Sequence, residues 1–92
     1  MAMFYTYVPV NVRTLRPYIG FSANLKGRVL AHQARDPDWQ LAYYEAYASE
    51  ADARQRERDL KQYGSAWGHL QRRMKRSLEL GKGGRSFDLK PR

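Results

Sequence analysis

The sequence predicts one small domain of the α+β class. Two kinds of segment predict it: strands rich in β-branched and aromatic residues, and helices whose apolar residues recur at the helical period. They follow one another in the order β-β-α-β-α-α. The chain has 92 residues, a length that suits one domain. A domain of this size buries only about 60 to 65 % of its unfolded surface, so each buried polar side chain is a noticeable cost. We expect the domain to cover residues 1–80 and a mobile basic tail to cover 81–92.

Strand formers and the residues that interrupt them define the predicted sheet. Pro9 is expected to close the first strand because it cannot donate to a strand ladder. Gly20 lies within the second predicted strand, where it allows close backbone approach. The predicted strands are 3–8, 17–21 and 39–47, with a loop at 9–16 that contains Asn11.

Serines and apolar periodicity define the predicted helices. Ser22, Ser49 and Ser65 are the expected N-caps, and Ser49 with Asp52 three residues later resembles a capping box. Gly64 is expected to end the second helix. The predicted helices are 23–35, 50–63 and about 66–80, the last with an apolar stripe of Trp67, Leu70, Met74 and Leu78.

Five polar residues stand out on these elements. Arg28 and His32 are one helical turn apart at the edge of the face that meets the sheet. Glu57 lies in the middle of the inward stripe of the second helix, where a carboxylate is expensive unless it is paired or binds a metal ion. Tyr7 and Tyr18 meet if the register of the first two strands allows it. If these phenols, guanidinium, imidazole and carboxylate converge, they suit a site for phosphodiester chemistry better than they suit a hydrophobic core.

Plainer explanations exist for each of these residues. Any single tyrosine is explained as a strand aromatic, Arg28 and Glu57 as an ordinary ion pair, and His32 as a half-buried imidazole with its hydrogen bonds satisfied. A zinc centre is not expected, because His32 and His69 are the only imidazoles and the chain has no cysteine. An oxygen-ligated Mg²⁺ or Mn²⁺ needs as little as one carboxylate with waters and phosphate oxygens.

Charge indicates the partner. Seventeen Lys and Arg against nine Asp and Glu give a formal charge of +8, which attracts polyanions, nucleic acid above all. No membrane partner is expected, since the longest uncharged apolar stretch, around residues 1–10, is too short to span a bilayer. Without cysteines or a recognisable signal peptide, we expect a cytoplasmic protein. The expected contacts to DNA phosphates are Arg72, Arg73, Lys75 and Arg76.

Together these residues resemble the GIY-YIG nuclease superfamily, in particular its small single-domain bacterial members. The set is Tyr7, Tyr18-Ile19-Gly20, Arg28, His32 and Glu57, and the spacing agrees: eleven positions from Tyr7 to Tyr18, ten to Arg28 and four to His32. The stretches 41–45 and 53–61 are similar to the family's third strand and metal-binding helix. The resemblance covers about residues 4–78. The chain departs from the family pattern in having Tyr5-Thr6-Tyr7 in place of Gly-Ile-Tyr, and in lacking an Asn downstream of Glu57.

The resemblance implies a three-stranded antiparallel sheet flanked by helices, and hydrolysis of a DNA phosphodiester with one divalent ion, Mg²⁺ or Mn²⁺, and no organic cofactor. Glu57 would hold the ion. Tyr7 is the first choice for the general base, with Tyr18 beside it or exchanging roles with it. Arg28 would grip the phosphate oxygens, and His32 would make a second contact or orient the tyrosine. Lys26, Lys61 and Glu45 are left outside the catalytic set.

Two other functions fit the same sequence. One is a nucleic-acid-binding module that keeps the fold and the basic surface but does not cleave. The other is a basic protein associated with RNA or the ribosome. A monomer is the default expectation for all three.

Overall fold

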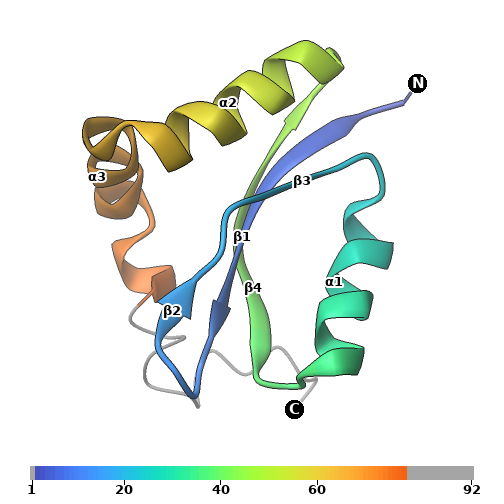
Figure 1. Cartoon of the computed structure of the whole chain (residues 1–92), viewed down its shortest axis with the longest axis vertical. Coiled ribbons are helices and arrows are strands. Elements are labelled where there is room, and N and C mark those ends of the chain that lie inside the picture. Colours follow the sequence, from blue (N-terminus) through green and yellow to red (C-terminus); the bar gives the residue numbers. More distant parts are fainter. Residues whose placement is uncertain (1, 79–92) are drawn as a thin grey trace.

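The apolar segment near the start of the chain forms the central strand of an antiparallel sheet (Figure 1). The computed structural model describes residues 2–78. β1 (Phe4–Asn11) pairs with β4 (Trp39–Tyr47) on one side and with both β2 (Arg16–Pro17) and β3 (Gly20–Ser22) on the other. The α+β class is thus confirmed, but the sheet of the described residues has four strands where three were predicted.

The extra strand arises because the predicted strand 17–21 is broken at Tyr18 and Ile19. Pro9 does not end β1 as predicted, and residues 9–11 are strand rather than loop. An irregularity in the pairing with β4 falls between Val8 and Pro9, where the missing N–H of proline is tolerated. The carbonyl of Pro9 accepts a hydrogen bond from the Tyr18 N–H at 2.9 Å, so Pro9 still ties β1 to the broken edge.

The helices follow the predicted order, with corrections at their starts. α1 (Leu25–Arg35) is capped by Asn24 rather than Ser22, because Ser22 ends β3 and its Oγ accepts the Asn24 N–H at 2.9 Å. α2 (Glu50–Gln62) has the predicted Ser49 cap, bonded to the Asp52 N–H. α3 (Gly64–Arg73) begins without a side-chain cap, so Ser65 lies inside its first turn, and residues 75–78 form a further helical turn. Leu80 and the predicted tail lie outside the described residues.

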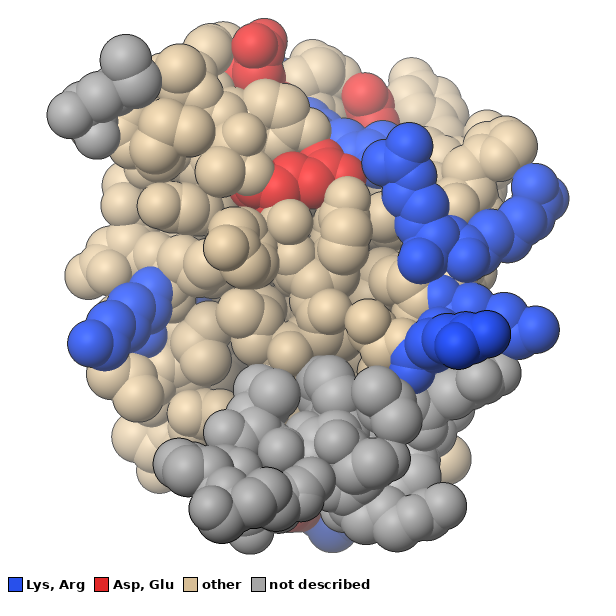
Figure 2. Space-filling view, turned by 180° about the vertical axis from the view of Figure 1, so that it is seen from behind, with Lys and Arg blue, Asp and Glu red and all other residues tan. Residues whose placement is uncertain are grey.

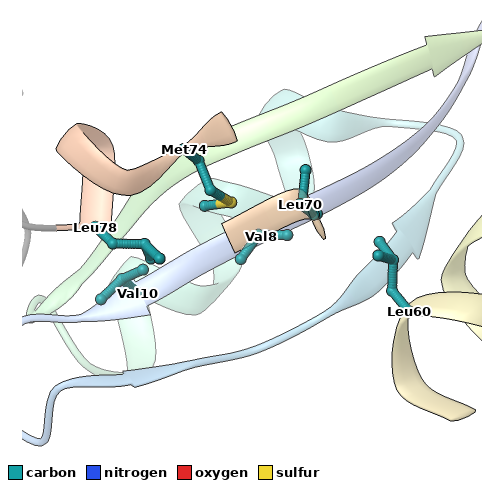
Figure 3. Packing of buried hydrophobic residues seen from close by; sticks show 6 residues of the cluster. All are labelled: Val8, Val10, Leu60, Leu70, Met74 and Leu78. Atoms are coloured by element: carbon teal, nitrogen blue, oxygen red, sulfur yellow. The ribbon is translucent and has the colours of Figure 1, made fainter. Parts of the chain in front are cut away.

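The core lies between the sheet and the helices α2 and α3, while α1 covers the other side of the sheet (Figure 1). Its buried residues are Val8, Val10, Leu60, Leu70, Met74 and Leu78 (Figure 3). The alternation along β1 explains the two faces: Thr6 and Val8 meet α2 and α3, and Tyr7 points the other way. No residue of α1 is fully buried. Among residues 2–78, no helix has the length and apolar composition needed to cross a bilayer.

Candidate nuclease site at the broken sheet edge

Tyr7 is positioned by the absence of a side chain on the neighbouring strand. Tyr7 is 1 % exposed, and Gly20 is its partner across the β1–β3 pair. A Cβ on Gly20 would lie 2.7 Å from Cε1 and Cζ of the Tyr7 ring, well inside van der Waals contact. Gly20 was predicted to allow close backbone approach; in the structure the group packed against it is a side chain, the Tyr7 phenol.

His32 and Tyr18 complete a cluster of rings with Tyr7. The Tyr7 hydroxyl and Nε2 of His32 are 3.0 Å apart in a hydrogen bond between β1 and α1. The ring of Tyr18 lies at 6.5 Å from the Tyr7 ring and 5.4 Å from the His32 ring, centroid to centroid. The Tyr18 residue is 43 % exposed, so the cluster opens to solvent at the gap between β2 and β3. The structure thus brings together the predicted phenols and the imidazole.

Trp39 belongs to the same cluster, and the sequence reasoning missed it. Its ring centroid is 5.8 Å from that of His32 and 6.4 Å from that of Tyr18. The α1–β4 turn brings it there, because Trp39 opens β4 directly after Asp36-Pro37-Asp38. A tryptophan at a strand start was the available signal, but only the pairing of Trp39 with Asn11 of β1 places it beside the histidine.

The electrostatics of the cluster keep both members of the Tyr7–His32 pair neutral in the free protein. Burial raises the pKa of Tyr7 to about 12; Arg28 opposes this shift, and Tyr18 and Glu57 add to it. Burial, with the nearby charges of Arg35 and Arg28, lowers the pKa of His32 below 6.5. At neutral pH the phenol therefore keeps its proton and the imidazole is uncharged. In the tautomer that carries its proton on Nδ1, Nε2 of His32 accepts a hydrogen bond from the Tyr7 hydroxyl.

Glu57 reaches this edge from α2. Its side chain is 20 % exposed, and Lys61, one turn later, donates from Nζ to its Oε2 at 3.0 Å. The same Nζ lies 5.8 Å from the centroid of the Tyr18 ring. The ion pair of Glu57 is therefore with Lys61 of its own helix, and the structure gives Glu57 a different partner from the Arg28 considered above.

The donor chemistry around Glu57 fits a magnesium-like ion only with help from substrate and solvent. Within residues 2–78 no group of three or more His, Cys, Asp or Glu side chains could hold a metal ion by itself. A single carboxylate at a partly exposed edge suits Mg²⁺, which usually keeps several waters and binds one or two carboxylates together with substrate phosphates.

The four predicted DNA-binding residues lie elsewhere on the molecule. Arg72 and Arg73 end α3, Lys75 and Arg76 follow in the next turn, and all four are exposed. The Arg73 guanidinium lies beside the hydroxyl of Tyr43, whose pKa is raised mainly by burial and by Glu45. Tyr43 is on β4, at the opposite edge of the sheet from β2 and β3. Figure 2, seen from behind, shows Lys and Arg side chains gathered on the side where α3 lies.

Glu45 lies on β4 in a separate polar cluster. Arg56 donates to both of its carboxylate oxygens, at 3.0 and 3.1 Å, and the hydroxyls of Tyr43 and Tyr47 donate to them as well. Burial acts to raise the pKa of Glu45, but these hydrogen bonds outweigh it and hold that pKa below 4.5. Glu45 thus joins β4 to α2, a structural role that the sequence reasoning did not predict.

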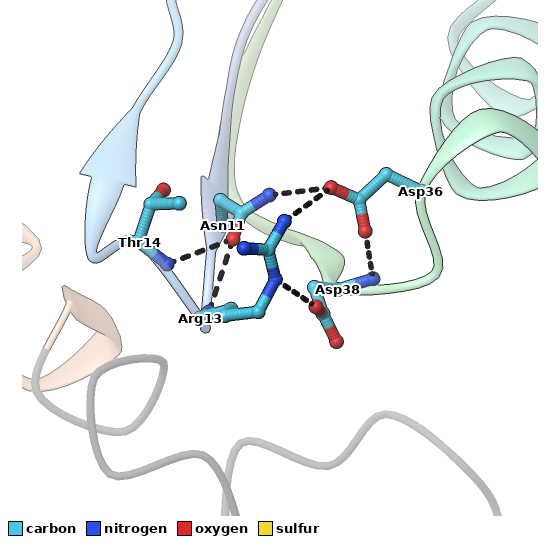
Figure 4. A network of polar contacts seen from close by, with 5 residues as sticks. All are labelled: Asn11, Arg13, Thr14, Asp36 and Asp38. Atoms are coloured by element: carbon cyan, nitrogen blue, oxygen red, sulfur yellow. Dashed lines mark hydrogen bonds and ion pairs between the residues drawn. The ribbon is translucent and has the colours of Figure 1, made fainter.

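Asn11 ties two turns together below the ring cluster (Figure 4). Its Oδ1 accepts the N–H groups of Arg13 and Thr14, and its Nδ2 donates to Asp36 at 3.0 Å. Arg13 also pairs with Asp36 and Asp38. The network joins the β1–β2 turn to the end of α1, the helix that carries His32. Asn11 was assigned to a loop, so this role was missed.

Comparison of the chain with family models, with curated proteins and with solved structures gave no match. The function is accordingly inferred from the residues of the site.

Proposed function

We propose that the protein is a divalent-metal-dependent DNA endonuclease of the GIY-YIG type. The observation that carries the proposal is the 3.0 Å hydrogen bond between the Tyr7 hydroxyl and Nε2 of His32, made at a sheet edge to which Tyr18 and Glu57 also come. A phenol and an imidazole can move a proton, a carboxylate can hold a metal ion and a guanidinium can stabilise developing charge, which together suit metal-assisted hydrolysis of a phosphodiester.

The proton path follows from the two pKa shifts. A phenol whose pKa is about 12 is almost wholly protonated at neutral pH, so it is a poor base by itself. When the water oxygen bonds to phosphorus, Tyr7 accepts the water proton and passes its own proton along the hydrogen bond to Nε2 of His32. The bond to the 3′ oxygen breaks, and that oxygen takes a proton from solvent. In this scheme His32 is the final acceptor on the protein and Tyr7 is the relay.

The remaining residues bind and orient. Arg28 favours negative charge at Tyr7 and would grip the non-bridging phosphate oxygens as charge develops there. Tyr18, beside Tyr7 at the open side of the cluster, orients the attacking water. Glu57 would hold Mg²⁺ or Mn²⁺, which when bound neutralises charge at the phosphate and at the leaving oxygen.

Plasmid cleavage tests the proposal. Supercoiled DNA is incubated with the protein and Mg²⁺, Mn²⁺ or EDTA, beside Glu57→Gln and Tyr7→Phe. The matched controls are Asp59→Asn on the same helix and Tyr63→Phe, a tyrosine 55 % exposed. We expect metal-dependent nicking that Glu57→Gln and Tyr7→Phe abolish and both controls retain. Nicking that survives Glu57→Gln, or that EDTA leaves intact, would disprove the assignment.

A binding module without catalysis is the second candidate. Two observations favour it: Lys61 already neutralises Glu57, and Arg73 lies at the opposite edge from the ring cluster. Salt-dependent binding to DNA or to structured RNA, without cleavage under any metal condition, would establish this candidate. The same measurement on Arg72→Gln and Arg73→Gln tests whether α3 contacts phosphates, since each lost contact reduces the salt slope by about one.

A further inference from the structure

Lys61 contacts two members of the candidate site at once. Its Nζ donates to Oε2 of Glu57 at 3.0 Å and lies 5.8 Å from the centre of the exposed Tyr18 ring. Lys61 itself is about half exposed, while the carboxylate it covers is 20 % exposed. Among the described residues, the ammonium group thus already occupies one oxygen of Glu57, the carboxylate that the candidate site offers to an ion.

Other cations of α2 are held differently. Arg54 pairs with the exposed Glu50 and lies over the Phe21 ring, and Arg58 donates to Gln55 at 2.9 Å. Arg58 is next to Glu57 in sequence, yet its hydrogen bond points it away along the exposed side of the helix. Substitution of Arg58 therefore removes a charge near Glu57 without removing a contact, whereas substitution of Lys61 removes both.

One carboxylate oxygen cannot serve an ammonium group and a hydrated divalent ion equally well. An ion that binds Glu57 must displace Nζ or share the carboxylate with it, and like charges then repel. The flexible four-carbon side chain of Lys61 lets the displaced ammonium group move to another position. A DNA phosphate at the site offers it a new anionic partner, so arrival of DNA and arrival of the ion favour each other.

We propose that Lys61 is a positioning residue that holds the place of the metal ion at Glu57 in the DNA-free protein and transfers to a DNA phosphate when the ion enters. This inference rests on the proposed function. Its consequence is that the ion binds weakly until substrate is present, which couples metal loading to DNA binding.

Metal binding without DNA tests the inference apart from activity. Mn²⁺ titrations of the DNA-free protein are followed by electron paramagnetic resonance for the wild type, Lys61→Met, Lys61→Arg and Arg58→Met. We expect Lys61→Met to bind Mn²⁺ about two- to fivefold more tightly, the worth of a partly exposed ion pair. Lys61→Arg should resemble the wild type, and Arg58→Met should change the affinity less than about twofold, because it removes an equal charge that does not touch Glu57. Thermal unfolding of each variant checks that it is folded.

Two further titrations complete the test. Adding Glu57→Gln to Lys61→Met should remove the gain. With DNA present in a Tyr7→Phe background, which prevents cleavage, the wild-type and Lys61→Met affinities should converge, since phosphate releases Lys61. Equal effects of Lys61→Met and Arg58→Met, no gain in Lys61→Met, or a gain that survives Glu57→Gln would each overturn the inference. Plasmid nicking by the wild type decides the proposed function separately.

Discussion

Substitution of Gly20 by alanine tests whether the position of Tyr7 controls the site. The new Cβ would lie 2.7 Å from two carbons of the Tyr7 ring and 2.8 Å from its hydroxyl oxygen. Ordinary contact needs roughly 3.5 Å or more, so the ring or β3 must move by about 1 Å. A movement of this size at the hydroxyl is enough to break the 3.0 Å hydrogen bond to His32.

Two magnitudes follow for Gly20→Ala. Overpacking of a buried ring costs about 1 to 3 kcal/mol of unfolding free energy. A misplacement of about 1 Å at a catalytic group lowers the rate by about 100-fold, if Tyr7 is the relay. Chemical denaturation measures the first quantity and single-turnover cleavage of DNA the second, under conditions where the variant is folded by circular dichroism.

Gly68→Ala is the matched control. A Cβ there meets nothing within 4 Å, and Gly68 lies inside α3, so this variant should gain about 0.5 to 1 kcal/mol and cleave normally. Gly20→Ala with wild-type stability would refute the packing argument. Loss of stability with wild-type cleavage by the folded variant would refute the role of Tyr7.

Two predictions follow from the pKa shifts. If His32 is the proton acceptor, kcat/KM for cleavage should rise with pH up to the lowered pKa of His32, below 6.5, and then stay level to about pH 9. If the Tyr7 phenolate is the base instead, kcat/KM should rise tenfold per pH unit up to the pKa of Tyr7, about 12. The carboxylate of Glu45 has a folded-state pKa below its ordinary 4.5, so its stabilisation is present above 4.5 and is lost as pH falls through the lower folded value. Glu45→Gln should therefore cost about 2 kcal/mol at pH 7, by leaving buried donors unpaired, and much less near pH 3, as measured by denaturation.

Each of these predictions has a control. His32→Ala should convert a level cleavage profile into one that rises throughout, since only the phenol remains to accept the proton. Glu50→Gln breaks an exposed ion pair and should change stability by less than about 0.5 kcal/mol at either pH. A Glu45→Gln protein as stable as the wild type at pH 7 would show that Arg56 and the two phenols do not depend on the carboxylate.

Elements with strong local signals were predicted well. β4 has the predicted bounds, and α2 begins after the predicted Ser49 cap, because alternating β formers and a capping serine act within a few residues. The break at Tyr18 and the continuation of β1 through Pro9 were not predicted. Both depend on how β1 pairs with three other strands at once, which no local pattern contains.

The same distinction holds at the site. The meeting of Tyr7, Tyr18 and His32 was predicted from their spacing and the resemblance it supports. The partner of Glu57 was not predicted, although Lys61 follows it by four residues on the same helix and such a pair is a signal that the sequence contains. Likewise, the basic residues 72, 73, 75 and 76 can be recognised in the sequence, but how far they lie from the ring cluster depends on how α3 packs toward β4.

The buried apolar core lies on one side of the sheet, and the Tyr7–His32 pair of the candidate site lies on the other. β1, α2 and the chain from α3 to Leu78 supply the buried apolar residues, whereas α1 contributes none and makes several polar contacts with its neighbours. These are the Tyr7 bond to His32, the Asn11 bond to Asp36 and a bond from Gln33 to the carbonyl of Trp39 at 3.1 Å. A helix fixed in this way opens at lower cost than the core, so the geometry of His32 can adjust while the sheet stays intact. The imidazole of the proposed proton path is thus carried by a helix with no fully buried residue.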